Sequence, residues 1–252
     1  IVSFIYLAIL KERPIIFNGS YFSKKPTGIS VVSQELAKSF NQELISLYAP
    51  YKVGDSKFYK LPKSFCPENG FKAHIKRLYW NQFKLSKIMK DNKDSILFSP
   101  LPEAPIIKGI KSVILVHDLL PRRIKCSLPL SLYHYIYIPR VIKYASKVIC
   151  NSLTTAYEVS KKLKVPDEKI EIIKLGFNKN KFLPLNLKRE PFMLIIASHL
   201  PHKNLPRVLH AFSLFKNLNK NFSDYKLKIA GRFDKRYTPS YKKLCKELSI
   251  EN

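Results

Sequence analysis

The chain has 252 residues, of which 46% are hydrophobic and 25% are charged, so it can bury a core and is not wholly disordered. Its 45 Lys+Arg exceed 18 Asp+Glu, a formal net charge of +27 that favours phosphate-rich partners. Only nine of these 45 residues are Arg, the side chain that reads nucleic acid through bidentate contacts. The pattern argues against nucleic acid as the partner, and it fits either an anionic partner of another kind or plain compositional bias.

The cysteines and the first residues of the chain narrow the class further. None of Cys66, Cys126, Cys150 and Cys245 forms a CxxC pair, which argues against zinc-knuckle and thioredoxin-type sites and fits a reducing, cytoplasmic compartment. Residues 1–10 are continuously apolar, but ten residues cannot cross a bilayer as a helix, and no signal-peptide features accompany them. We interpret them as an extension before the first strand or as an incomplete N-terminus.

Short apolar runs alternate with longer amphipathic stretches along the chain, which is typical of β-α units around a mostly parallel sheet. The first strand is predicted over 14–18 and is followed by a loop containing Gly28. Residues 50–75 are rich in Pro, Gly and aromatics and predict irregular structure with one short strand. The other elements predicted before residue 177 are helix 29–40, strand 44–47, helix 77–89, strand 95–99, strand 112–117, helix 130–145 with Pro139 inside it, strand 147–150, helix 154–163 capped by Ser152, and strand 169–175.

The pattern is interrupted at 178–190, a polar stretch without periodicity that we interpret as a linker. It then restarts with strand 192–197, helix 205–218, strand 225–230 and helix 240–248. Two β-α units make about half of a Rossmann domain and leave a bare parallel edge. The organisation predicted is therefore a Rossmann-like domain over 1–177, the linker, and a partial second Rossmann-like domain over 191–252, with the chain cut off partway through that domain.

Polar residues at the ends of two predicted strands are candidates for chemistry. His117 and Asp118 close the apolar strand SVILVH, and His202, Lys203 and Asn204 stand between a strand and a helix. Ligands of open α/β sheets bind at the carboxyl ends of strands, and a Lys beside a helix N-terminus suits a diphosphate. The alternatives are a strand-end histidine satisfied by backbone and one more solvated Lys.

Five segments, in this order, resemble glycosyltransferase family four: KPTGISVVSQELAKSF, VILVHDLLP, KIEIIKLGFNKNKF, ASHLPHKNLPRVLHAF and KLKIAGRFDKRY. The resemblance spans residues 14 to 248. It implies the GT-B fold, in which an acceptor-side Rossmann-like domain precedes a second one that binds the nucleotide sugar. It also implies retaining transfer of a hexosyl unit from a nucleotide-diphosphate sugar to a saccharide or lipid-linked acceptor, as in cell-surface polysaccharide synthesis, without a metal or other cofactor.

The resemblance also assigns roles to residues. Gly28 matches a glycine that lets the backbone approach the donor phosphates, and His117 matches a histidine near the transferred sugar, with Asp118 orienting it or capping the next segment. Lys203 matches a phosphate-binding Lys, followed by Asn204, whereas His202 stands where many members have Arg. The family's pair of glutamates in the donor domain has no counterpart within the chain.

Other readings stay open from the sequence. The charge fits a polyanion-binding protein, and the missing glutamate pair fits a non-catalytic remnant. A nucleotide-sugar epimerase or dehydrogenase needs a GxGxxG fingerprint after its first strand, but Gly19 and Gly28 are nine residues apart. The basic composition also suits a transferase at the cytoplasmic face of an anionic membrane, bound peripherally.

Overall fold

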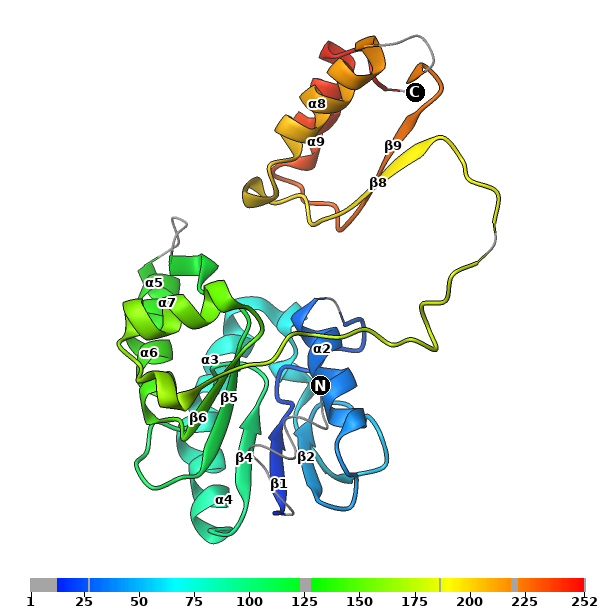
Figure 1. The fold of residues 1–252 in the computed structure, drawn as a ribbon. Coiled ribbons are helices and arrows are strands. Elements are labelled where there is room, and N and C mark those ends of the chain that lie inside the picture. The colour runs from blue at the N-terminus through cyan, green and yellow to red at the C-terminus, as the bar shows by residue number, and fades with distance from the viewer. Residues whose placement is uncertain (1–12, 27, 123–127, 186, 219–221, 252) are drawn as a thin grey trace. The chain divides into compact units, whose positions relative to one another are not determined.

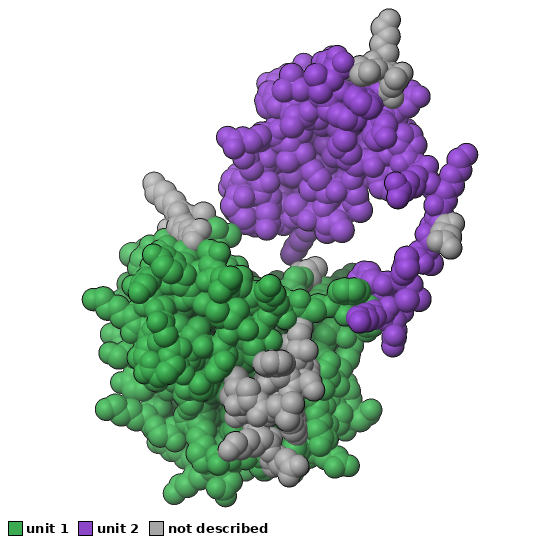
Figure 2. All heavy atoms as spheres, in the orientation of Figure 1, with its two compact units in different colours: residues 1–178 green, residues 179–252 purple. Residues whose placement is uncertain are grey.

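The computed structural model describes residues 13–26, 28–122, 128–185, 187–218 and 222–251. The apolar segment 1–10 and Cys126 lie outside the described residues. The chain divides into two compact units, Ile1–Asn178 and Lys179–Asn252 (Figures 1 and 2). Each unit is described by itself.

The first unit is built on one parallel sheet of seven strands in the order β3-β2-β1-β4-β5-β6-β7. This is the strand order of a doubly wound Rossmann sheet, so the predicted α/β class is confirmed. The strands are β1 Ile15–Asn18, β2 Ile45–Ala49, β3 Lys57–Lys60, β4 Ile96–Ser99, β5 Ser112–Val116, β6 Lys147–Cys150 and β7 Ile170–Ile172. β1, β4 and β5 are buried along their whole length because helices and loops cover both faces of the sheet.

Helices connect these strands and form two apolar clusters, one on each face of the sheet (Figure 1). The first cluster joins Trp80, Met89, Val141 and Val159, whereas the second joins Leu36 to Phe17 and other strand residues. The helices are α2 Ile29–Ser39, α3 Gly70–Trp80, α4 Ser86–Asp91, α5 Leu128–Leu132, α6 Ile138–Tyr144 and α7 Leu153–Leu163, with π-helical turns at Asn81–Leu85 and Tyr133–Tyr137.

The prediction of a helix over 77–89 is wrong at its start, because α3 begins at Gly70. The helix carries its apolar residues in an unusual place: Phe71 and Ile75 are exposed, while Arg77 is buried. The apolar periodicity of the first two turns therefore does not predict a helix that packs on the core. The helix predicted over 130–145 is interrupted by the π-helical turn before Pro139, which has no N–H to continue the regular pattern.

The second unit is half of a Rossmann arrangement. Strands β8 Phe192–Ile196 and β9 Lys226–Ala230 pair in parallel, and helices α8 Leu205–Leu218 and α9 Thr238–Glu247 follow them. Leu205, Leu209 and Phe212 of α8 are buried. After β9 the chain needs a glycine, because a Cβ on Gly231 would lie 1.8 Å from the carbonyl oxygen of Ala197.

Candidate functional site

The carboxyl edge of the seven-stranded sheet is where the first unit gathers polar side chains. β1 and β4 are neighbours there although the chain leaves them in opposite lateral directions, which is the switch point of a doubly wound sheet. Asn18 ends β1, Ser99 ends β4 and His117 follows β5. Ligands of such sheets bind at this edge.

Asn18 fills the switch point with a buried amide. Its Nδ2 lies 2.7 Å from the carbonyl oxygen of Glu103 and 3.0 Å from Oδ1 of Asn81, so the amide donates to the loop after β4 and to the π-helical turn after α3. Ser99 Oγ also donates to the Glu103 carbonyl, at 3.0 Å. Burying an amide costs little free energy when both of its hydrogens are bonded, and these hydrogen bonds hold the neighbouring residues in one geometry.

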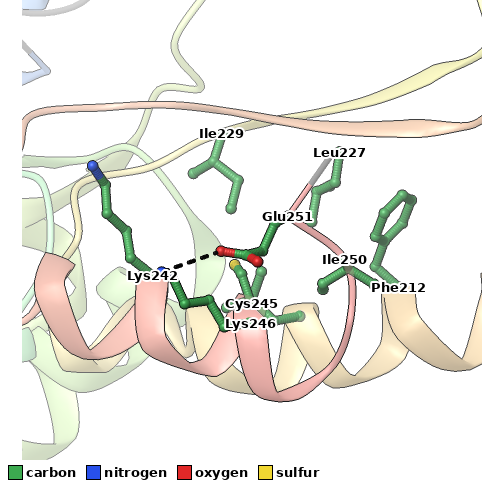
Figure 3. Close-up of a pocket in the computed structure, with 9 residues that line it drawn as sticks. Phe212, Leu227, Ile229, Lys242, Cys245, Lys246, Ile250 and Glu251 are labelled. Atoms are coloured by element: carbon green, nitrogen blue, oxygen red, sulfur yellow. Dashed lines mark ion pairs between the residues drawn. The ribbon is translucent and has the colours of Figure 1, made fainter.

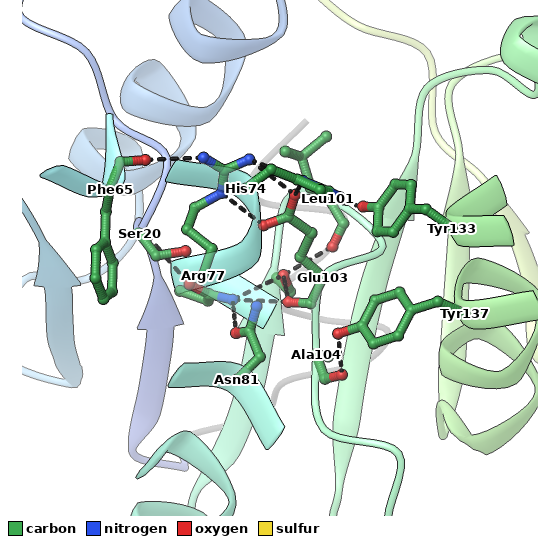
Figure 4. A network of polar contacts seen from close by, with 12 residues as sticks. Ser20, Phe65, His74, Arg77, Asn81, Leu101, Glu103, Ala104, Tyr133 and Tyr137 are labelled. Atoms are coloured by element: carbon green, nitrogen blue, oxygen red, sulfur yellow. Dashed lines mark hydrogen bonds and ion pairs between the residues drawn. The ribbon is translucent and has the colours of Figure 1, made fainter. Parts of the chain in front are cut away.

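Arg77 and Glu103 form a buried pair beside this amide (Figure 4). Arg77 also donates to the carbonyl oxygen of Phe65 at 2.8 Å, and Tyr133 donates its hydroxyl to Glu103 Oε1 at 3.3 Å. His74 Nδ1 lies 3.5 Å from the same Glu103 oxygen. Burial alone would raise the pKa of Glu103, but the hydrogen bonds and charges of His74 and Arg77 outweigh burial and lower it to about 2.

His117 lies half-buried at the end of β5, with Nε2 3.1 Å from the carbonyl oxygen of Pro100. A carbonyl only accepts, so Nε2 carries the proton and Nδ1 of the neutral ring is the acceptor. Burial lowers the pKa of His117, and the Pro100 hydrogen bond and the charge of Asp118 oppose it less strongly. The ring is therefore neutral at pH 7 and keeps one lone pair for a ligand.

The residues around His117 hold its backbone. Asp118 is exposed, and its Oδ1 accepts the N–H of Leu120 at 2.9 Å, so it caps the following turn. Among the described residues Asp118 makes no hydrogen bond to the His117 ring. Ser152 accepts the N–H of Thr155 at 3.1 Å, which confirms the predicted cap of α7, and Thr155 Oγ1 donates to the His117 carbonyl at 3.2 Å.

Gly28 lies on the same edge of the sheet, at the end of the loop from β1 to α2. Its φ of 50° and ψ of −115° are accessible only to glycine, whereas a Cβ there would meet nothing within 4 Å. No side chain caps the first turn of α2. Conformation, rather than crowding, is thus the reason for glycine, and the space beside the helix N-terminus is open.

His202, Lys203 and Asn204 belong to the second unit, between β8 and α8. His202 and Lys203 end a short 3-10 turn, Pro201–Lys203, and Asn204 adopts a left-handed conformation with φ of 52° that redirects the chain into α8. All three are exposed. Lys203 therefore stands beside the helix N-terminus at the carboxyl end of β8, as its sequence position predicted.

The second unit also contains a cavity of about 330 Å³ between β9, α8 and α9 (Figure 3). Leu209, Phe212, Leu227 and Ile229 make its walls mostly apolar. Lys246 and Glu251, 3.8 Å apart, form an ion pair at the cavity. His202, Lys203 and Asn204 do not line this cavity.

Comparisons with known proteins show the family to which the chain belongs. Residues 26–181 match the family model Glycosyltransferase Family 4. The chain belongs to glycosyltransferase family 4. A search of curated protein sequences gives no significant match. The resemblance seen in the sequence is thereby confirmed, and the match takes in both Gly28 and His117 of this family 4 chain.

Solved structures agree in fold. Anabaena HepE in complex with UDP and glucose has a TM-score of 0.62 at 15% identity, with 96% of this chain and 68% of that chain covered. For a Rickettsia africae glycosyltransferase the TM-score is 0.56 at 13% identity, with 96% of this chain and 67% of that chain covered. For the UDP-forming α,α-trehalose-phosphate synthase of Burkholderia xenovorans the TM-score is 0.57 at 11% identity, with 96% of this chain and 69% of that chain covered. The GT-B type of fold is therefore confirmed for this family 4 glycosyltransferase.

Two further searches concern metals and membranes. Within the described ranges no group of three or more His, Cys, Asp or Glu side chains is placed to hold a metal ion. Over the same part of the family 4 chain, no helix combines the length and apolarity needed to cross a bilayer.

The sequence did not single out Asn18, Arg77 or Glu103. Asn18 had a usable signal, because it ends the apolar run PIIFN in the same way that His117 ends SVILV. Arg77 had no signal in the sequence, since a basic residue on a helix is ordinarily exposed to solvent. Glu103 follows two prolines in a loop, where burial cannot be read from apolar spacing.

Proposed function

We propose that this chain transfers a hexosyl unit from a nucleotide-diphosphate sugar to a saccharide or lipid-linked acceptor, with retention, in the synthesis of a cell-surface polysaccharide. The observation that carries the proposal is the family 4 match over residues 26–181. UDP and glucose bound to Anabaena HepE support a nucleotide-sugar donor. We assign residues 1–177 to the acceptor side, 178–190 to the linker and 191–252 to the donor side.

The first unit contributes His117 and Gly28. The neutral His117 ring offers Nδ1 as an acceptor to a hydroxyl of the transferred sugar or of the acceptor molecule, while Nε2 stays bonded to Pro100. Gly28 and the uncapped start of α2 offer backbone N–H groups and a partial positive charge to the donor phosphates.

The second unit contributes Lys203, beside the N-terminus of α8, with His202 and Asn204 next to it. As the bond from sugar to diphosphate breaks, negative charge develops on the leaving diphosphate, and Lys203 stabilises that charge. A diphosphate oxygen then accepts the proton of the acceptor hydroxyl on the same face of the sugar, so the new bond forms with retention. Asp118, the other residue assigned to the reaction, holds the turn that follows His117.

The basic composition supports a reaction at the cytoplasmic face of an anionic membrane, with the protein bound peripherally. A protein that only binds polyanions has the same net charge, but the family match gives it no support. A remnant without activity would retain the fold but would not bind the nucleotide-sugar donor.

Titration with UDP- and GDP-sugars by calorimetry tests the proposal, with released nucleotide measured in the presence of lipid-linked acceptors. Lys203→Ala should weaken donor binding about tenfold to a hundredfold, because a hydrogen bond to a charged group is lost. Lys216→Ala, in the last turn of the same helix, is the matched control and should bind as the wild type does. Absence of donor binding by the wild type would favour the remnant, and equal binding by both variants would remove Lys203 from the site.

A further inference from the structure

We propose that the outer face of α3 and of the π-helical turn after it binds an anionic lipid bilayer. The inference deepens the proposed function and rests on it, since it names the surface through which the enzyme would meet a membrane-bound acceptor. Two features of the face carry it: an exposed apolar stripe, and exposed lysines that alternate with that stripe along the sequence.

The stripe consists of four large side chains spaced four residues apart. Phe71, Ile75, Tyr79 and Phe83 are 57%, 48%, 60% and 62% exposed. The ring centroids of Tyr79 and Phe83 lie 4.6 Å apart, so these two side chains are in contact. A soluble surface rarely exposes a contiguous apolar patch without a partner for it.

The π-helical turn keeps this stripe on one side. An α-helix has 3.6 residues per turn, so residues four apart drift around the axis in one direction. The π-helical turn Asn81–Leu85 has hydrogen bonds one residue longer and is wider, so a step of four falls short of a full turn. The drift accumulated from Phe71 to Tyr79 is thus partly reversed before Phe83.

The charged side chains within the segment that carries the stripe are all basic. Residues 69–90 contain no Asp or Glu. The exposed basic residues of this stretch are Lys72, Lys76, Lys84, Lys87 and Lys90. Within the described part of the chain none of these lysines takes part in an ion pair. Lysines that flank aromatic residues are typical of helices lying in the interface of an anionic membrane, where the side chains reach the headgroups.

The same segment buries two polar residues while four large apolar side chains stay exposed. Arg77 and Asn81 are buried and bonded to Glu103 and Asn18, whereas the stripe of Phe71, Ile75, Tyr79 and Phe83 faces outward. A helix whose outer face met only water would have the opposite arrangement. An anionic bilayer satisfies both the apolar stripe and the five unpaired lysines, and for that reason we assign the face to lipid.

The position of the helix relates this face to the candidate site. β3 ends at Lys60 on the carboxyl edge of the parallel sheet, and β4 begins at Ile96 on the opposite edge. α3 therefore starts near the edge that carries His117 and runs away from it (Figure 1). An acceptor anchored in a bilayer under Phe71 would emerge at that edge.

Flotation of the full chain with phosphatidylglycerol vesicles tests the apolar stripe. The wild type should float with these vesicles and not with phosphatidylcholine vesicles. The variant I75S/Y79S/F83S should lose at least tenfold in vesicle affinity, since each side chain removes buried apolar area in the interface. The control L153S/Y157S on α7, where the side chains are 70% and 64% exposed, should float as the wild type does.

A second pair of variants tests the charges. K72Q/K76Q should lower the affinity for phosphatidylglycerol about thirtyfold, as two lysines leave the membrane surface, and K161Q/K174Q should not. No flotation of the wild type, flotation equally strong with neutral vesicles, or equal losses in test and control variants would overturn the proposal. The proposal would also be overturned if the wild type were a dimer in solution and I75S/Y79S/F83S a monomer, because the stripe would then be an interface between two copies of the chain.

Donor titration of the same proteins separates this proposal from the proposed function. Stripe variants should keep wild-type affinity for the nucleotide sugar. If the wild type binds vesicles but no nucleotide sugar, the proposed function is contradicted, whereas the assignment of this face to lipid is not.

Discussion

The guanidinium of Arg77 meets the carboxylate of Glu103 at two points, with Nε 2.9 Å from Oε2 and Nη2 3.2 Å from Oε1. The pair joins α3 to the loop after β4. That loop also carries Pro100, whose carbonyl receives the His117 ring. The geometry of the candidate site thus depends on an ion pair that touches no ligand.

Glu103→Gln should destabilise the protein by about 3–5 kcal/mol, because it leaves the guanidinium of Arg77 buried without a counter-charge. Unfolding in urea measures the loss. The control is Glu171→Gln, which breaks the half-exposed pair of Glu171 with Lys147 and should cost no more than about 1 kcal/mol. Similar losses in the two variants would show that the buried pair is not specially important.

The same pair predicts how stability depends on acid. The pKa of Glu103 is lowered from 4.5 to about 2 in the folded protein, so its contribution is fully present above pH 4.5 and is lost as the pH falls towards 2. The difference in unfolding free energy between wild type and Glu103→Gln should therefore narrow across that window. A difference that stays constant from pH 5 to 2 would contradict the lowered pKa.

His117→Ala should slow sugar transfer about tenfold to a hundredfold and leave donor affinity within about twofold, because one hydrogen bond near the sugar is removed. His210→Ala, an exposed histidine on α8, is the control. Burial lowers the pKa of His117, so the wild-type rate should show no inflection from this ring above its ordinary pKa of 6.5. An inflection above pH 7 that disappears in His117→Ala would contradict a neutral imidazole.

Gly231→Ala should disrupt the second unit, since the added Cβ would lie 1.8 Å from the Ala197 carbonyl oxygen. That oxygen belongs to the backbone and cannot rotate away as a side chain can. Limited proteolysis should cut residues 191–252 faster in this variant than in the wild type. Gly109→Ala, in the first unit, is the control: a Cβ there meets nothing within 4 Å, and its φ of 84° strains an alanine without any contact to the second unit's backbone. Equal cleavage of the two variants would mean that the second unit accommodates the added Cβ without a loss of stability.

The sequence was enough to predict the strands, because buried parallel strands are short apolar runs and polar residues mark their carboxyl ends. That rule located His117 and Lys203. It failed at the start of α3, where Phe71 and Ile75 face outward, and at the Asn18 network, whose contacts join residues 63 to 85 positions apart. Local patterns contain no information about partners so distant.

One nitrogen of His117 is occupied by the backbone of the loop next to its strand. A histidine that passes protons along a chain takes one at one nitrogen and releases another at the opposite nitrogen, so both must be available. This ring has only Nδ1 to offer. It can accept from a hydroxyl at Nδ1, but it cannot pass a proton from one nitrogen to the other while the Pro100 hydrogen bond is kept, so the ring is a terminus for protons and not a relay.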